Sequence, residues 1–182
     1  MTTESSHVLP DILDHNLKLV ICGTAAGDKS AGYNSKEKTY DEDEKAYYAG
    51  FGNVFYPTMA LCGFTPYLLR PKQFREMIKF GIGFTDLAKF THGMDKSLKK
   101  EDHDPKGFEE KILKFQPEVV CFNGKEAAMI YLKTKTTKEI SYGLQQAVIN
   151  KTKLFVAPST SPTAKRYWDE RYWQQLKDLI VW

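Results

Sequence analysis

Residues 17–27 read LKLVICGTAAG, and this stretch decides the fold class. The apolar run 17–22 predicts a buried parallel strand, because a strand covered on both faces carries a nearly continuous row of apolar residues. Gly23 and Gly27 bound the loop that is expected to follow. Since open α/β sheets bind ligands at the carboxyl ends of their strands, residues 23–27 are a candidate binding site.

The rest of the chain alternates strand and helix patterns. Strands are expected at 81–87 (GIGFTDL), at 118–122 (EVVCF) and, as a strand or hairpin, at 147–157. Helical patterns occupy 55–62, the segment after Pro71, the segment after Asn123-Gly124, and 167–180. We therefore predict one α/β domain over 1–182, a three-layer αβα sandwich with a short, mainly parallel central sheet. Residues 1–14 are expected to be loosely attached, and 25–45 to be a loop.

Composition narrows the class of protein without naming it. The chain has 182 residues and 26 Lys+Arg against 23 Asp+Glu, a formal charge of +3 that permits DNA binding but does not indicate it. Its three cysteines have no CxxC spacing, so no disulfide, zinc site or iron–sulfur cluster is expected. We expect a cytoplasmic monomer, or a nuclear one if the source is eukaryotic, without a membrane segment. His92 is expected in a surface loop.

Four blocks in a fixed order carry a family resemblance. They are GTAAG at 23–27, YAGFGNVFY at 48–56, GFTD at 83–86 and PSTSP at 158–162. In this order they resemble the mismatch-specific uracil/thymine branch of the uracil-DNA glycosylase superfamily, and YYA, FNG and PSTSP also resemble its hypoxanthine branch. The resemblance, over about 17–168, implies a monofunctional enzyme of base excision repair without cofactor or metal. Such an enzyme flips uracil or a related deaminated base out of DNA and hydrolyses its N-glycosidic bond.

The resemblance also implies roles for individual residues. Tyr48 stands at the position of the stacking aromatic. Asn123 either reads the polar edge of the base or merely forms a turn with Gly124. Backbone N–H groups around Thr24 and Ala25 can take up charge on the departing base. The expected DNA contacts, which lack the bulky leucine wedge of several family members, are Ser159, Thr160, Ser161, Pro162, Lys165 and Arg166.

The first block departs from the family at Ala25, where the mismatch-specific branch has a water-positioning asparagine. A methyl group cannot orient water, so another residue must assist hydrolysis or the activity is lost. Asp86, placed at a strand end, is the first candidate, and its alternative role is the N-cap of a helix over DLAKF. Asn53 is the second candidate and the acidic run 41–44 the third.

Two other functions remain open. The chain is alternatively a catalytically silent DNA- or base-binding module, for which Ala25 is the argument, or a hydrolase of free nucleosides. The preferred base and the strand preference are not predicted.

Overall fold

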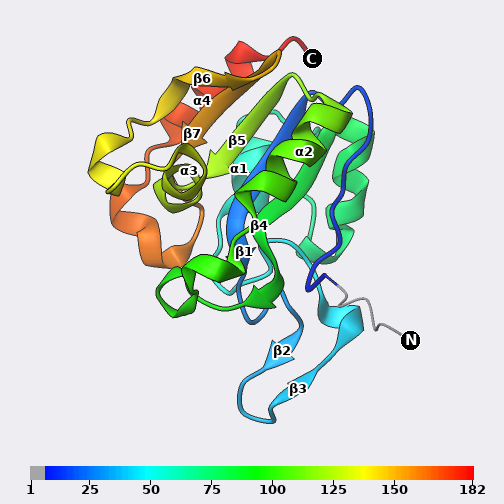
Figure 1. The fold of residues 1–182 in the computed structure, drawn as a ribbon. Coiled ribbons are helices and arrows are strands. Elements are labelled where there is room, and N and C mark those ends of the chain that lie inside the picture. Colours follow the sequence, from blue (N-terminus) through cyan, green and yellow to red (C-terminus); the bar gives the residue numbers. More distant parts are fainter. Residues whose placement is uncertain (1–6) are drawn as a thin grey trace.

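The computed structural model describes residues 7–182 and is built on a five-stranded sheet (Figure 1). The strand order is β4 (Ile82–His92), β1 (Leu19–Ala26), β5 (Val119–Asn123), β7 (Thr152–Ala157) and β6 (Gly143–Ile149). The first four strands run parallel, and β6 pairs with β7 as an antiparallel hairpin. The expected short, mainly parallel sheet is confirmed.

Helices cover both faces of this sheet. The helix α1 (Phe55–Leu61), the 3-10 helix η2 (Pro71–Phe80) and α4 (Glu170–Leu179) lie behind it in Figure 1, while α2 (Pro105–Phe115) and α3 (Lys125–Leu132) lie in front. A hydrophobic core lies on each face of the sheet, and successive residues of β1 point into opposite cores. Ile21 packs into the core that contains Phe55, and Val20 into the core that contains Phe108. The chain is therefore the predicted three-layer αβα sandwich.

Two strands are longer than expected. β1 continues through the first block to Ala26, and β4 continues past Asp86 to His92. Their pairing with each other explains this, because Gly23 lies opposite Asp86 and Ala25 opposite Ala88. Asp86 is thus inside a strand rather than at its end, and the alternative that it caps a helix over DLAKF is wrong.

The segment 25–45 is not a simple loop. It contains the two-stranded hairpin of β2 (Tyr33–Asn34) and β3 (Thr39–Tyr40), which projects away from the main sheet in Figure 1, and the 3-10 helix η1 (Glu42–Glu44).

The expectation of a loosely attached N-terminus is wrong for residues 8–12. The N–H of Val8 donates to the carbonyl of Lys89 at 2.7 Å, and that of Ile12 to the carbonyl of Phe84 at 2.9 Å. Leu9 is 1% exposed, so this segment is part of the core. Residues 1–6 lie outside the described residues. Within 7–182, no helix has the length and apolar character needed to cross a bilayer.

Candidate active site

A cleft of about 780 Å³ opens where the parallel strands present their carboxyl ends. The four blocks all contribute to it. Residues lining it include Gly23, Thr24, Ala25, Tyr48, Asn53, Asp86, Asn123, Ser159, Thr160, Ser161, Pro162 and Arg166. Lys165 is exposed and is not among the lining residues, so of the two predicted cations only Arg166 borders the cleft.

Strand register explains why the blocks meet. Gly23 pairs with Asp86 on one side of β1, and Cys22 pairs with Phe122, the residue before Asn123, on the other. The pairing between β1 and β5 stops at Cys22, so β1 runs on beyond its neighbour. One side of its backbone from Gly23 onward is therefore free of ladder partners and can offer N–H groups to a ligand.

Asp86 is the most perturbed acid of the cleft. It is 3% exposed, and within residues 7–182 its carboxylate makes no ion pair. Burial raises its pKa to about 6, while Lys89, Lys111 and the backbone of Gly23 act to lower it and Asp11 to raise it. A carboxyl group with such a pKa exists in both protonation states near neutral pH, which suits proton transfer.

The nearby lysines are already engaged. Asp11 binds the ammonium groups of Lys89 and Lys111, each at 2.9 Å, and accepts a hydrogen bond from Thr85 at 2.7 Å. Lys89 also donates to the hydroxyl of Tyr47 at 3.1 Å. Asp11 thus pairs directly with both lysines, whereas Asp86 has no direct counterion among the described residues.

Gly23 is required by the position of Asp86. A Cβ atom on Gly23 would lie 2.5 Å from Oδ1 of Asp86 and 3.6 Å from the hydroxyl oxygen of Tyr48. A separation of 2.5 Å is too short for non-bonded atoms, so only glycine lets this carboxylate lie against β1.

Tyr48 borders the cleft in a strained conformation. Its φ is +57°, a left-handed value that is uncommon for residues other than glycine. Its ring stacks on Phe55 at a centroid distance of 4.3 Å, which leaves at most the opposite face for a base. The hydroxyl is buried and makes no hydrogen bond of regular geometry within the described residues. Burial and Asp86 raise its pKa, and the nearby amide of Asn123 lowers it.

Asn123 is tied to the fourth block. Its Nδ2 donates to Oγ1 of Thr160 at 2.9 Å, and its Oδ1 accepts from the N–H of Thr160 at 3.0 Å. The positive φ of the turn, 117°, falls on Gly124 rather than on Asn123. The amide retains one further hydrogen and one further lone pair, so it can still bind a ligand while it holds the loop.

Asn53 has a structural role that the sequence did not indicate. Its Oδ1 accepts the N–H of Phe55 at 3.0 Å, at the start of α1. The acidic run 41–44 does not line the cleft, and its Glu44 pairs with Lys29 and Lys72 instead. The geometry therefore favours Asp86 over the two alternative candidates.

Sequence reasoning missed two further acids of the cleft, Asp95 and Glu126. Burial of the carboxyl group raises the pKa of Asp95, and a hydrogen bond from Thr24 opposes the shift. The pKa of Glu126 is raised by burial and by the charge of Asp95. Asp95 lies three residues after the end of β4 at His92, so a correct boundary for that strand was the signal that could have found it.

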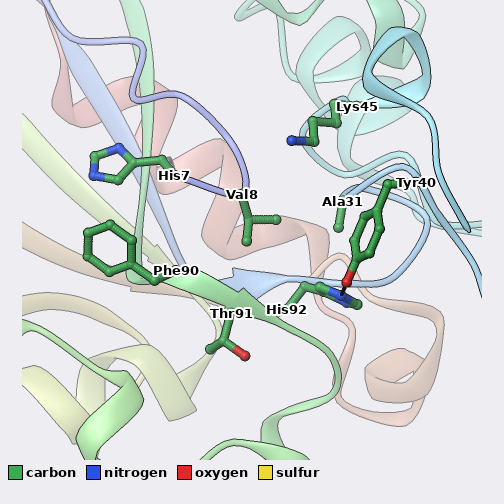
Figure 2. Close-up of a pocket in the computed structure, with 8 residues that line it drawn as sticks. All are labelled: His7, Val8, Ala31, Tyr40, Lys45, Phe90, Thr91 and His92. Carbon is green, nitrogen blue, oxygen red and sulfur yellow. Dashed lines mark hydrogen bonds between the residues drawn. The ribbon is translucent and has the colours of Figure 1, made fainter. Parts of the chain in front are cut away.

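His92 is not a free surface-loop residue, because it joins the β2–β3 hairpin to the sheet. Its Nε2 shares a hydrogen bond with the hydroxyl of Tyr40 at 2.7 Å, and its Nδ1 shares one with Asp28 at 2.9 Å. Figure 2 shows Tyr40 and His92 in contact beside a second, smaller pocket. At the base of this hairpin, Ser30 accepts the N–H of Ala49 at 3.1 Å, next to Tyr48.

Replacing His92 by alanine removes both hydrogen bonds. We expect the free energy of unfolding to fall by about 1–2 kcal/mol, because each such bond contributes about 0.5–1.5 kcal/mol. Amide hydrogens of residues 33–40 should exchange faster, measured by mass spectrometry. His15→Ala, a change at an exposed histidine outside the hairpin, is the control. Unchanged exchange at 33–40 would show that the hairpin does not depend on His92.

The fold and the cleft define an α/β protein whose site combines a stacking ring, an amide and a buried carboxylate. The sequence model of the uracil DNA glycosylase superfamily matches residues 10–179. The chain belongs to this superfamily of DNA glycosylases, enzymes of base excision repair.

Proposed function

We propose that this protein is a monofunctional DNA glycosylase that flips a deaminated base, uracil or a relative, out of DNA and hydrolyses its N-glycosidic bond. The observation that carries the proposal is the meeting of Tyr48, Asn123 and Asp86 in one cleft. A flat face, an amide and a carboxylate are the groups needed to stack a base, to pair with its edge and to assist its release.

Hydrolysis breaks the bond between C1′ of the sugar and the ring nitrogen of the base. The base leaves with the bonding electrons, and backbone N–H groups at Thr24 and Ala25 can stabilise its negative charge. Water adds to C1′, and its proton passes to Asp86, which before that step stabilises the positive sugar. The products are the free base and an abasic site. Asp86 thereby assists the hydrolytic water, which the methyl group of Ala25 cannot do.

DNA contacts follow from the position of the fourth block. Ser159, Ser161 and Pro162 border the cleft and face the duplex next to the flipped nucleotide. Thr160 was expected to contact DNA as well, but it is 1% exposed and is bonded to Asn123, so it holds the loop instead. Arg166, at the rim, and Lys165, one residue before it, can bind phosphate groups and fix the register of the DNA.

Water rather than a lysine amine is the proposed nucleophile. Lys125, which directly follows Asn123-Gly124, is placed away from the cleft. Its ammonium group lies 4.5 Å from the centroid of the Tyr142 ring, and the residue does not line the cleft. Lys96 does line the cleft, on the exposed 3-10 helix η3 (Asp95–Ser97). If water is the nucleophile, borohydride should trap no covalent complex with DNA, whereas a trapped complex would assign the attack to a lysine such as Lys96.

The function is tested with oligonucleotides that carry uracil or hypoxanthine in single-stranded, paired and mismatched contexts. Alkali cleaves the chain wherever a base has been removed, and we expect cleavage of at least one of these substrates. The competing function, a silent DNA- or base-binding module, is favoured by Ala25 and predicts binding of the same duplexes with no alkali-sensitive product.

Tyr48 gives the first test of the pocket. Tyr48→Ala should lower the affinity for product base and the excision rate, because stacking on an aromatic ring contributes about 1–3 kcal/mol per base. Tyr48→Phe should retain most of both, because it keeps the aromatic ring. Equal loss of activity in the two variants would assign the role to the hydroxyl instead of the ring.

A further inference from the structure

Phe51 stands out among the apolar side chains near the cleft because it is 100% exposed. It lies in the short turn between Tyr48 and α1, and its neighbour Gly50 lines the cleft. A phenylalanine in full contact with water contributes nothing to the core and carries a large apolar area that is available to a partner.

The turn that carries Phe51 is braced. The N–H of Asn53 donates to the carbonyl of Gly50 at 3.1 Å, which closes the turn. The N–H of Val54 donates to the carbonyl of Thr160, also at 3.1 Å, and a Cβ on Gly52 would lie 3.5 Å from Pro162. The turn and the 158–162 loop thus form one continuous rim, and the aromatic ring is held at its edge.

We propose that Phe51 is the residue that inserts into the duplex beside the flipped nucleotide. This inference rests on the proposed function, since a flipped nucleotide leaves two base faces without a stacking partner, and an aromatic ring can cover them. The neighbouring 158–162 loop offers only serine, threonine and proline side chains for that space. Phe51 supplies the bulky apolar group that this loop lacks.

The experiment uses duplexes in which the damaged nucleotide is replaced by tetrahydrofuran, an abasic analogue, so that neither the preferred base nor catalysis enters the result. 2-Aminopurine is placed next to the analogue to report stacking. Wild-type protein should bind this duplex more tightly than the undamaged duplex and should change the 2-aminopurine fluorescence.

Phe51→Ala should weaken binding to the analogue duplex about 10- to 100-fold, the range that stacking of one base gives, and it should abolish the fluorescence change. Phe51→Trp should keep both. Leu61→Ala, a truncation of another exposed apolar side chain outside the cleft, is the matched control and should behave as wild type. Thermal unfolding should be unchanged in all three variants.

The outcomes separate the two proposals. If Phe51→Ala retains the affinity and the fluorescence change of the wild type, the role of Phe51 is wrong while the glycosylase function stands. If the wild type itself does not distinguish the analogue duplex from undamaged DNA and excises no base, the proposed function fails.

Discussion

Asp86→Asn is expected to slow single-turnover excision by about 10²–10⁴-fold, the usual contribution of a general base or of a charge placed for the transition state. Asparagine has the shape of aspartate and fits beside Gly23, so the loss isolates the negative charge. Excision is measured by quenching the reaction with alkali under excess enzyme. Asp95→Asn, which removes another carboxylate of the cleft, is the matched comparison.

The same residue predicts a pH profile. Since burial raises the pKa of Asp86 to about 6, its ionised form accumulates as the pH rises through that value. Excision by the wild type should therefore increase from pH 5 to pH 7 and then level off, and Asp86→Asn should lack this rise. If Asp86→Asn excises at nearly the wild-type rate and Asp95→Asn is slow, the catalytic carboxylate is Asp95.

The contribution of Asp86 to the free energy of unfolding should fall as the pH rises, whereas the excision rate should increase. The pKa of Asp86 in the folded protein lies above the ordinary value of 3.8, so the folded state holds this proton more tightly than the unfolded chain does. Its contribution to stability is then most favourable below pH 4 and is lost as the pH rises through 6. At pH 7.5 the asparagine variant should unfold with a free energy about 1–3 kcal/mol higher than the wild type, since one pKa unit corresponds to about 1.4 kcal/mol.

Asn123→Ala is expected to reduce excision by at least about 100-fold, because a site built to pair with a base edge loses that pairing. It should also destabilise the protein by about 2–3 kcal/mol, since the buried N–H and hydroxyl of Thr160 both lose their partner. Excision is measured at a temperature well below the unfolding midpoint, so that all of the variant is folded.

Thr160→Val separates the two roles of Asn123. Valine removes the hydroxyl that accepts from Nδ2 but keeps the backbone N–H that donates to Oδ1. This variant should lose about 1 kcal/mol of stability and most of its activity should remain. Loss of excision as large as in Asn123→Ala would mean that Asn123 acts only by holding the 158–162 loop.

The sheet and the meeting of the four blocks could be predicted from the sequence, because buried parallel strands such as 118–122 are continuous apolar runs. The end of β4 could not. Residues 86–90 suit a helix by local propensity, and only their pairing with β1, some 60 residues away in the chain, makes them a strand. Because the strand was expected to end at residue 87, Asp86 was placed at a strand end and Asp95 was not considered as a site residue.

The charged residues around Asp86 could not be predicted from the sequence either. Its pKa depends on Lys89, Lys111 and Asp11, and Asp11 lies 100 residues from Lys111 in sequence. The sequence around Asp11 gives no indication that it pairs with Lys89 and Lys111. In the same way, nothing in the local sequence indicates that Asn53 accepts the N–H of Phe55.

The attachment of residues 8–12 also covers part of one edge of the sheet. β4 is one of the two edge strands of the sheet, and an edge strand with free N–H and C=O groups is a template on which another chain can add. Val8 and Ile12 occupy part of that edge by pairing with Lys89 and Phe84. Deletion of residues 1–12 would therefore do more than shorten the N-terminus. It would expose the edge of β4 and favour strand addition between copies, and it would strip Lys89 and Lys111 of their shared carboxylate.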